Sequence, residues 1–151
     1  MDGSTLKKLF WKIRIIAEVT LFAFILNWLW EYAQCSTFIH LNAPATHQEM
    51  FLASLGDVLL TWISIGSMGL ISRSPFWFLE RWSWIRLALL TLFNLTLGGC
   101  IEWIALKNGR WAYTSSNPVI SSLNISILPL LQLCLLIPFS LWLARIRSQR
   151  L

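Results

Sequence analysis

Residues 50–72, MFLASLGDVLLTWISIGSMGLIS, form a run of 23 residues in which Asp57 is the single charged side chain. About 20 apolar residues are needed for a helix to cross the hydrocarbon core of a bilayer. Three further stretches of similar length and character lie at residues 15–33, 87–106 and 123–144. The sequence therefore predicts four transmembrane helices.

The composition of the whole chain agrees with this prediction. Of the 151 residues, 56% are hydrophobic and 13% are charged, whereas a soluble domain carries about 25% charged residues. Four spans and their connections use nearly all of the chain, so we expect one integral membrane domain over residues 1–151, folded as an antiparallel all-α bundle. The net charge of +5 does not indicate nucleic-acid binding, because no basic run is longer than the pair Lys7 and Lys8.

Lysine and arginine mark one side of the predicted bundle. Four precede the first span, three lie in the second connection and three in the carboxyl tail, whereas the third connection has only Lys107 and Arg110. The positive-inside rule then places both termini in the cytoplasm, in a multi-pass protein of the bacterial inner membrane. A cleaved signal peptide is the competing account of the first span. Because Glu18 interrupts this span and no small-residue cleavage site follows it, we expect the span to be retained.

Residues 75–85, in the second connection, contain three tryptophans. Aromatic rings are enriched at membrane interfaces. We expect a short helix that lies in the interface with its rings among the lipid headgroups.

Polar side chains within the predicted spans gather at one depth. Counted from the ends of the spans, five of them fall in the outer half of the bilayer, and Gln34 continues the same face of the first helix. These five are Asn27, Glu31, Asp57, Glu102 and Gln132. An ionisable residue within a span indicates function, because a charge in hydrocarbon is costly. We expect one pocket that opens toward the outer surface, in which at least one of the three acids stays protonated.

The third connection adds candidates to this pocket. Asn108 and Gly109 predict a tight turn. Arg110 is the expected partner of Glu102 or Glu31, and a contact with lipid headgroups is an equally good account of it. Tyr113 is placed to cap the pocket with its hydroxyl group.

Other residues are expected to pack or to stabilise. Four glycines, Gly66, Gly69, Gly98 and Gly99, favour close helix approach, and Glu18 is expected to pair with Arg14 one turn earlier. The three cysteines are too widely spaced for a CxxC motif. We expect them to be packing residues, and a disulfide between Cys35 and Cys100 is the alternative. His40 and His47 would have to converge with Asp57 to bind a metal, so we expect loop histidines and no metal site.

Several short motifs carry a resemblance over all four spans. They are Asn27-x-x-Trp30-Glu31-x-x-Gln34, Gly56-Asp57, Glu102-Trp103, Arg110-Trp111-Ala112-Tyr113 with Pro118, and Pro129-x-x-Gln132. This pattern resembles an uncharacterised family of small bacterial four-helix integral membrane proteins. In that family a histidine closely precedes the Gly-Asp pair and a methionine precedes the loop proline, whereas here His47 is distant from Gly56 and Asn117 precedes Pro118.

More distantly, the chain is similar to membrane carotenoid hydratases and to lycopene and meroterpenoid cyclases. The shared features are a glutamate on one helix, a Trp-x-Tyr after a glycine-containing turn, and a proline on the last helix. This resemblance implies acid-initiated chemistry on an isoprenoid double bond or epoxide.

Our leading hypothesis is a membrane-embedded acid/base enzyme of the cyclase, hydratase or isomerase type, acting on an isoprenoid-like lipid. Asp57 or Glu102 is the general acid, and the remaining carboxylates, including Glu31, adjust its acidity. The amide side chains of Asn27, Gln34 and Gln132 orient the group that is protonated, and the rings of Trp30, Trp103 and Trp111 stabilise a carbocation. Neither a metal nor an organic cofactor is expected.

Two other hypotheses stay open. In the first, the polar residues form a structural network in a non-enzymatic bundle that supports a partner or self-association into a homo-oligomer. In the second, the chain is a small proton-coupled transporter, although four helices without internal repeats do not suit alternating access. The expected partner of the leading hypothesis is a membrane lipid or another lipophilic substrate.

Overall fold

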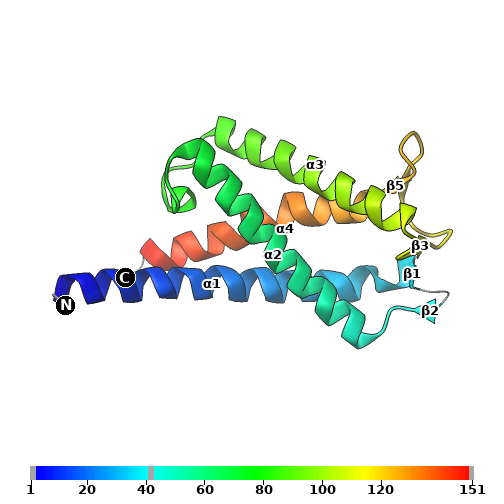
Figure 1. The fold of residues 1–151 in the computed structure, drawn as a ribbon, viewed down its shortest axis with the longest axis horizontal. Helices are drawn as coiled ribbons and strands as arrows, with labels where there is room; N and C mark the ends of the chain where they lie inside the picture. Colours follow the sequence, from blue (N-terminus) through cyan, green and yellow to red (C-terminus); the bar gives the residue numbers. More distant parts are fainter. Residues whose placement is uncertain (1–2, 41–42, 150–151) are drawn as a thin grey trace.

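Four helices packed antiparallel dominate the computed structural model, which describes residues 3–40 and 43–149. The helices are α1 (Gly3–Gln34), α2 (His47–Ser72), α3 (Trp84–Lys107) and α4 (Ile127–Gln149). Both ends of the described chain lie at one end of the bundle, which we call the terminal end, and the short strands lie at the other, the strand end (Figure 1).

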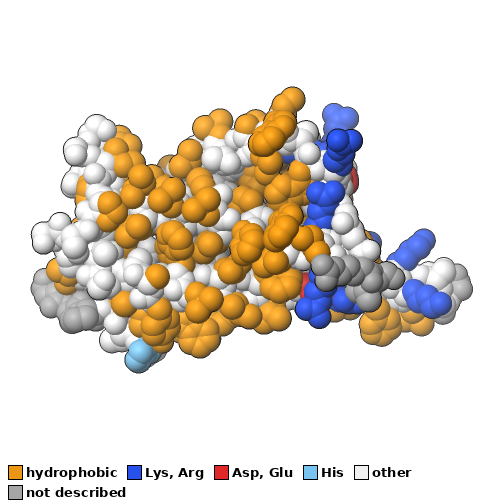
Figure 2. Space-filling model, turned by 180° about the vertical axis from the view of Figure 1, so that it is seen from behind, with side chains coloured by type: hydrophobic (Ala, Val, Ile, Leu, Met, Phe, Trp, Pro, Cys, Tyr) orange, Lys and Arg blue, Asp and Glu red, His pale blue; other side chains and the backbone are white. Residues whose placement is uncertain are grey.

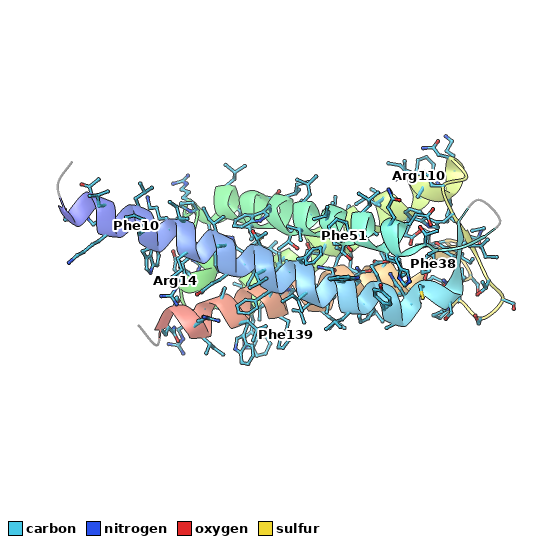
Figure 3. The ribbon with its side chains drawn as sticks, turned by 90° about the horizontal axis from the view of Figure 1, so that it is seen from below. Phe10, Arg14, Phe38, Phe51, Arg110 and Phe139 are labelled. Carbon is cyan, nitrogen blue, oxygen red and sulfur yellow. The ribbon has the colours of Figure 1, made fainter. Side chains whose placement is uncertain are left out.

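Three of the four helices, α2, α3 and α4, are long and apolar enough to cross a membrane, which indicates a multi-pass membrane protein. The longest helix, α1, is not among these candidates. It begins at Gly3, well before the predicted span at residues 15–33, because the preceding residues also favour a helix. Phe10 and Arg14 therefore lie near the terminal end, opposite Phe38 and Arg110 at the strand end (Figure 3).

The surface agrees with a membrane location. Hydrophobic side chains cover the middle of the face shown in Figure 2, and lysine and arginine gather at the terminal end. Large apolar side chains such as Leu70, Ile71 and Leu92 are exposed on the helices. A soluble monomer rarely exposes so continuous an apolar surface.

The strand end corrects the all-α prediction, because two small antiparallel sheets join the helices there. One contains β1 (Phe38–His40), β2 (Ala43–Pro44) and β3 (Ala112–Tyr113) in the order β2-β1-β3. The other pairs β4 (Val119–Ile120) with β5 (Ile125–Ser126). Loop backbone groups at this end satisfy one another by pairing. The fourth helix accordingly begins at Ile127 and not at residue 123.

The terminal end of the bundle is closed by aromatic side chains of the second connection. Trp77 and Phe78, in the 3₁₀ helix η2 (Trp77–Leu79), are completely buried, and the Trp77 indole Nε1 donates to the Ile65 carbonyl at 3.1 Å. The expected interfacial helix over residues 75–85 is therefore wrong for these two rings, which fill the bundle. Trp84, in contrast, is 86% exposed.

Several smaller predictions are tested directly. The Arg14–Glu18 ion pair is confirmed at 2.9 Å, and Arg147 of α4 also reaches Glu18 at 3.1 Å. A Cβ atom on Gly98 would lie 3.2 Å from Leu130 and Leu133, which confirms a close approach of α3 and α4.

The other glycine and cysteine predictions fare differently. A Cβ on Gly66 or Gly99 would meet no described atom within 4 Å, so these two glycines do not mediate close contacts, and Gly69 faces the second connection near Ser74.

The three cysteines, Cys35 among them, carry free thiols. Within residues 3–40 and 43–149, no group of three His, Cys, Asp or Glu residues could hold a metal, although the His40 side chain lies outside the described part.

Candidate functional site

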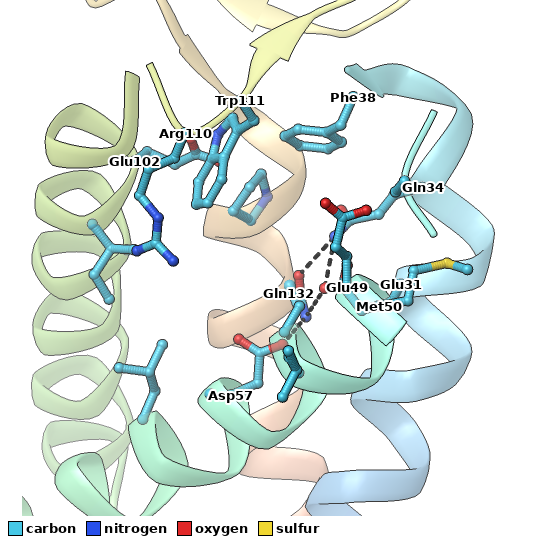
Figure 4. Close-up of a pocket in the computed structure, with 18 of the residues that line it drawn as sticks. Glu31, Gln34, Phe38, Glu49, Met50, Asp57, Glu102, Arg110, Trp111 and Gln132 are labelled. Carbon is cyan, nitrogen blue, oxygen red and sulfur yellow. Dashed lines mark hydrogen bonds between the residues drawn. The ribbon is translucent and has the colours of Figure 1, made fainter. Parts of the chain in front are cut away.

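A cavity of about 740 Å³ lies in the half of the bundle next to the strand end. All four helices and the third connection contribute to its walls (Figure 4). Most of the wall is apolar, but four carboxyl groups on three different helices line it. They are Glu31 on α1, Glu49 and Asp57 on α2, and Glu102 on α3.

The cavity has an apolar rim on α2. Leu52 and Leu59 line it and are 55% and 62% exposed on the lateral surface. α2 and α3 lie together at the end where η2 connects them and separate toward the strand end (Figure 1). On this side the cavity is lined by Leu52 and Leu59 of α2 and by Gly98 and Ile101 of α3.

One wall is organised around the side-chain amide of Gln132 on α4. Its Nε2 lies 2.7 Å from Asp57 Oδ2, 2.9 Å from Asn27 Oδ1 and 3.1 Å from Glu31 Oε1. Gln34 donates to Gln132 Oε1 at 3.2 Å and to Glu31 Oε1 at 3.0 Å. The structure thus brings together the polar residues predicted on the first, second and fourth helices.

This cluster has more acceptors than its central donor can serve. An amide nitrogen carries two hydrogens, whereas three oxygens surround Nε2 of Gln132. Two of these oxygens belong to carboxyl groups, those of Glu31 and Asp57. The cluster therefore has spare acceptor capacity facing a cavity, an arrangement that can receive a donor from a ligand.

Glu102 lies on the opposite wall and is held separately. Its Oε2 accepts from the Trp111 indole Nε1 and from the Tyr113 hydroxyl, both at 2.9 Å. Its Oε1 is buried and has no hydrogen-bond partner within the described part of the chain. The carboxyl group is thus fixed through one oxygen while the other is uncommitted.

Tyr113 was predicted to cap the pocket with its hydroxyl group, but this hydroxyl donates to Glu102, and Tyr113 is not among the residues that line the cavity. Its hydroxyl also accepts from the backbone N–H of Ser126 at 2.9 Å, which ties β5 to β3. Burial raises the pKa of the Tyr113 hydroxyl above its ordinary value. The hydroxyl therefore keeps its proton and donates to Glu102 at neutral pH.

Three other predicted binding residues lie outside the cavity wall. Asn27 is buried beside it and donates to the Ala23 carbonyl. The Trp30 indole donates to Gln34 Oε1 at 2.8 Å, and the Trp103 ring is 55% exposed beneath the Lys107 ammonium group. Of the three tryptophan rings predicted to stabilise a carbocation, Trp111 lines the cavity, whereas Trp30 and Trp103 do not.

Arg110 lines the cavity but does not make the predicted ion pair. Within the described part of the chain, no salt bridge joins it to Glu102 or Glu31. Its guanidinium carbon lies 5.7 Å from the centre of the Trp111 ring.

Glu49 and Phe38 are among the lining residues that were not predicted as part of this site. Glu49 lines the cavity from the first turn of α2, where it forms a capping box with Thr46. It lies two turns before Asp57, so the helical stripe that singled out Asp57 could have included it. Phe38 also lines the cavity, and its ring packs edge-on against Tyr113 at 5.6 Å. No periodic signal marks Phe38, because it lies in a short strand.

The structure defines a four-helix protein with three candidate spans and a carboxyl-lined cavity. No family model, curated protein or solved structure matches the chain. A functional assignment therefore depends on the chemistry of the cavity.

Proposed function

We propose that the chain is a four-span protein of the bacterial inner membrane whose cavity is the active site of an acid/base enzyme. The substrate is an isoprenoid-like lipid, and the reaction is of the cyclase, hydratase or isomerase type. Both termini are cytoplasmic, so the strand end faces outward; the basic residues at the terminal end support this orientation (Figure 2). Since α1 packs along α4, a candidate span, α1 is the fourth span.

One observation carries the proposal: carboxyl groups from three helices line a single cavity whose other walls are mostly apolar and whose rim includes the exposed side chains of Leu52 and Leu59. Ionisable groups within a membrane are expensive and usually functional. A largely apolar pocket with a few convergent polar groups is the common form of a small-molecule site.

In the proposed reaction, Glu102 or Asp57 is the general acid, and the position of Glu102 favours it. Its Oε2 accepts two hydrogen bonds, so a proton on Oε1 has no competing partner. The proton moves to one carbon of a substrate double bond, whose π electrons form the new C–H bond. The other carbon becomes a carbocation, which the Trp111 ring is placed to stabilise.

The carbocation is then quenched in one of three ways. In a cyclase, a second double bond of the substrate attacks it, and the new carbocation then loses a proton from a neighbouring C–H bond. In a hydratase, water adds and loses one of its protons, and in an isomerase a neighbouring C–H bond of the first carbocation loses its proton. Each route releases one proton, which a carboxylate of the Asp57 and Glu31 pair accepts. Gln132 and Gln34 hold that pair in position.

A structural network is the second candidate, and Gln132 favours it. This one side chain bonds to residues of α1 and α2 from α4, which is what a residue that holds helices together would do. In that case the carboxyl groups would contribute stability and not chemistry.

The experiment compares lipid extracts of cells that express the wild type, Glu102→Gln or Glu80→Gln with extracts of cells lacking the gene. Glu80 is the matched control because it is an exposed carboxylate that pairs with Arg86 far from the cavity. We expect a shifted isoprenoid species, by mass spectrometry and chromatography, for the wild type and Glu80→Gln. Glu102→Gln should reduce it at least about 100-fold, the ordinary contribution of a general acid. Identical extracts from all four strains would refute the proposal.

A further inference from the structure

Arg110 is the one lysine or arginine that lines the cavity within the described part of the chain. It follows the Asn108–Gly109 turn, where Gly109 has a φ of +62°, a conformation that favours glycine. The backbone N–H of Arg110 donates to the Ala105 carbonyl at 3.0 Å, which ties the turn to the end of α3. The residue is thus fixed at the mouth of the cavity on the strand side.

The guanidinium group is available to a ligand. The carboxyl groups that share its cavity bond to other groups: Glu31 and Asp57 to Gln132, Glu102 to Trp111 and Tyr113, and Glu49 to Thr46. Figure 4 shows the Arg110 side chain pointing into the cavity. A guanidinium presents five N–H donors in a plane that matches phosphate and carboxylate oxygens.

The position of Arg110 matches the headgroup of an amphiphile. Arg110 and Glu102 line the same cavity, and Figure 4 shows the guanidinium group extending alongside α3 past the level of the Glu102 carboxyl group. Apolar side chains of Ile101, Leu59 and Leu60 line the cavity with these groups. A head bound to Arg110 would therefore place the adjoining part of an apolar chain in the same cavity as the acid.

We propose that Arg110 binds the anionic headgroup of the lipid that occupies this cavity, and that the lipid is a prenyl phosphate or a similar long-chain phosphate monoester. Its chain leaves the cavity between α2 and α3 past Leu52 and Leu59. This inference rests on the proposed function, because it names the substrate class of the same site.

The test measures the affinity of the full-length protein in nanodiscs for geranylgeranyl phosphate and for geranylgeraniol, which has the same chain without the charge. The wild type should bind geranylgeranyl phosphate at least about tenfold more tightly than geranylgeraniol, since one strong charge-assisted hydrogen bond is enough for a tenfold difference in affinity. Arg110→Gln should abolish this preference, and Arg110→Lys should retain part of it. Lys107→Gln is the matched control, because Lys107 lies at the same end but packs on the Trp103 ring outside the cavity.

Two results would overturn the inference. One is an Arg110→Gln protein that keeps the wild-type preference for the phosphate. The other is displacement of the lipid by inorganic phosphate alone at equal concentration, which would show a site for free phosphate and not for a lipid. Binding is measured without turnover, so the two proposals fail separately. If the lipid extracts show no product but the protein prefers the phosphate in an Arg110-dependent way, only the proposed enzymatic function is refuted. If the extracts show a product that depends on Glu102 but the protein has no preference for the phosphate, only the headgroup site is refuted.

Discussion

The two halves of the bundle use similar apolar helices in different ways. Next to the terminal end, the helices pack around an apolar core in which Val19, Trp77, Phe78, Leu90 and Leu141 are completely buried. Next to the strand end, α2 and α3 separate, and polar side chains from every helix surround a cavity. The half next to the terminal end can therefore supply stability. The half next to the strand end has polar groups with hydrogen-bonding capacity left for a ligand, as functional sites commonly do.

The connections explain this difference. Between α2 and α3, the short second connection inserts Trp77 and Phe78 between the helices and holds their adjoining ends together. At the strand end, α3 and α4 are joined by a long connection whose backbone pairs with β1 and within its own hairpin, and bonds to α3 near the last turn of that helix. A cavity can therefore persist there without loss of the core.

The largest expected effect on stability comes from a substitution in the apolar core next to the terminal end. Trp77→Ala removes a completely buried indole and its hydrogen bond to Ile65, so we expect a loss of about 3–5 kcal/mol in the free energy of unfolding. Thermal unfolding of the purified protein in detergent measures the loss. Trp84→Ala, at an exposed tryptophan of the same connection, should stay within about 0.5 kcal/mol of the wild type. Equal losses for both variants would contradict a core centred on Trp77.

A smaller effect is expected where the two halves meet. Gly98→Ala places a Cβ 3.2 Å from the flexible ends of Leu130 and Leu133, so α3 and α4 must give slightly, and we expect a loss of about 1 kcal/mol. Gly99→Ala meets no described atom within 4 Å and should be neutral or stabilising, because alanine favours the helix. The same unfolding measurement checks both, and a stabilised Gly98→Ala would show that the helices do not touch there.

The smallest effect tests the strand half and depends on pH. Tyr113→Phe removes the bonds to Glu102 and Ser126, and we expect a loss of about 1 kcal/mol at pH 8. Because the pKa of Tyr113 is raised in the folded state, its contribution is present below the unfolded pKa near 10 and declines as the pH rises above it. The difference in melting temperature between wild type and variant should narrow between pH 9 and about pH 11. A constant or widening difference would contradict this contribution.

Depth in the membrane could be predicted from the sequence, because residues lie a countable number of turns from the ends of a span. That count placed Glu31, Asp57 and Gln132 at one level, and the structure brings them within hydrogen-bond distance. The count also placed Glu102 at this level, and in the structure Glu102 lines the wall of the cavity opposite Gln132.

The direction of side chains around each helix was harder to predict. A membrane helix is apolar on its lipid face as well as inside, so only its few polar residues mark the inner face. Trp30 and Trp103 each adjoin a cavity glutamate in sequence, but neighbours on a helix point about 100° apart, and both rings miss the cavity. The pairing of β1 with β3 and the burial of Trp77 depend on irregular segments without a period, so no pattern predicted them.

The most direct test of the central claim compares the melting temperatures of wild type, Asp57→Asn and Glu102→Gln in one detergent. Both amides keep an oxygen that can accept the existing bonds from Gln132, Trp111 and Tyr113. If the carboxyl groups serve chemistry, each variant melts within about 2 °C of the wild type, since 1 kcal/mol corresponds to about 2–4 °C at this size. If both variants melt about 5 °C or more below the wild type, the groups hold the helices together and the claim fails.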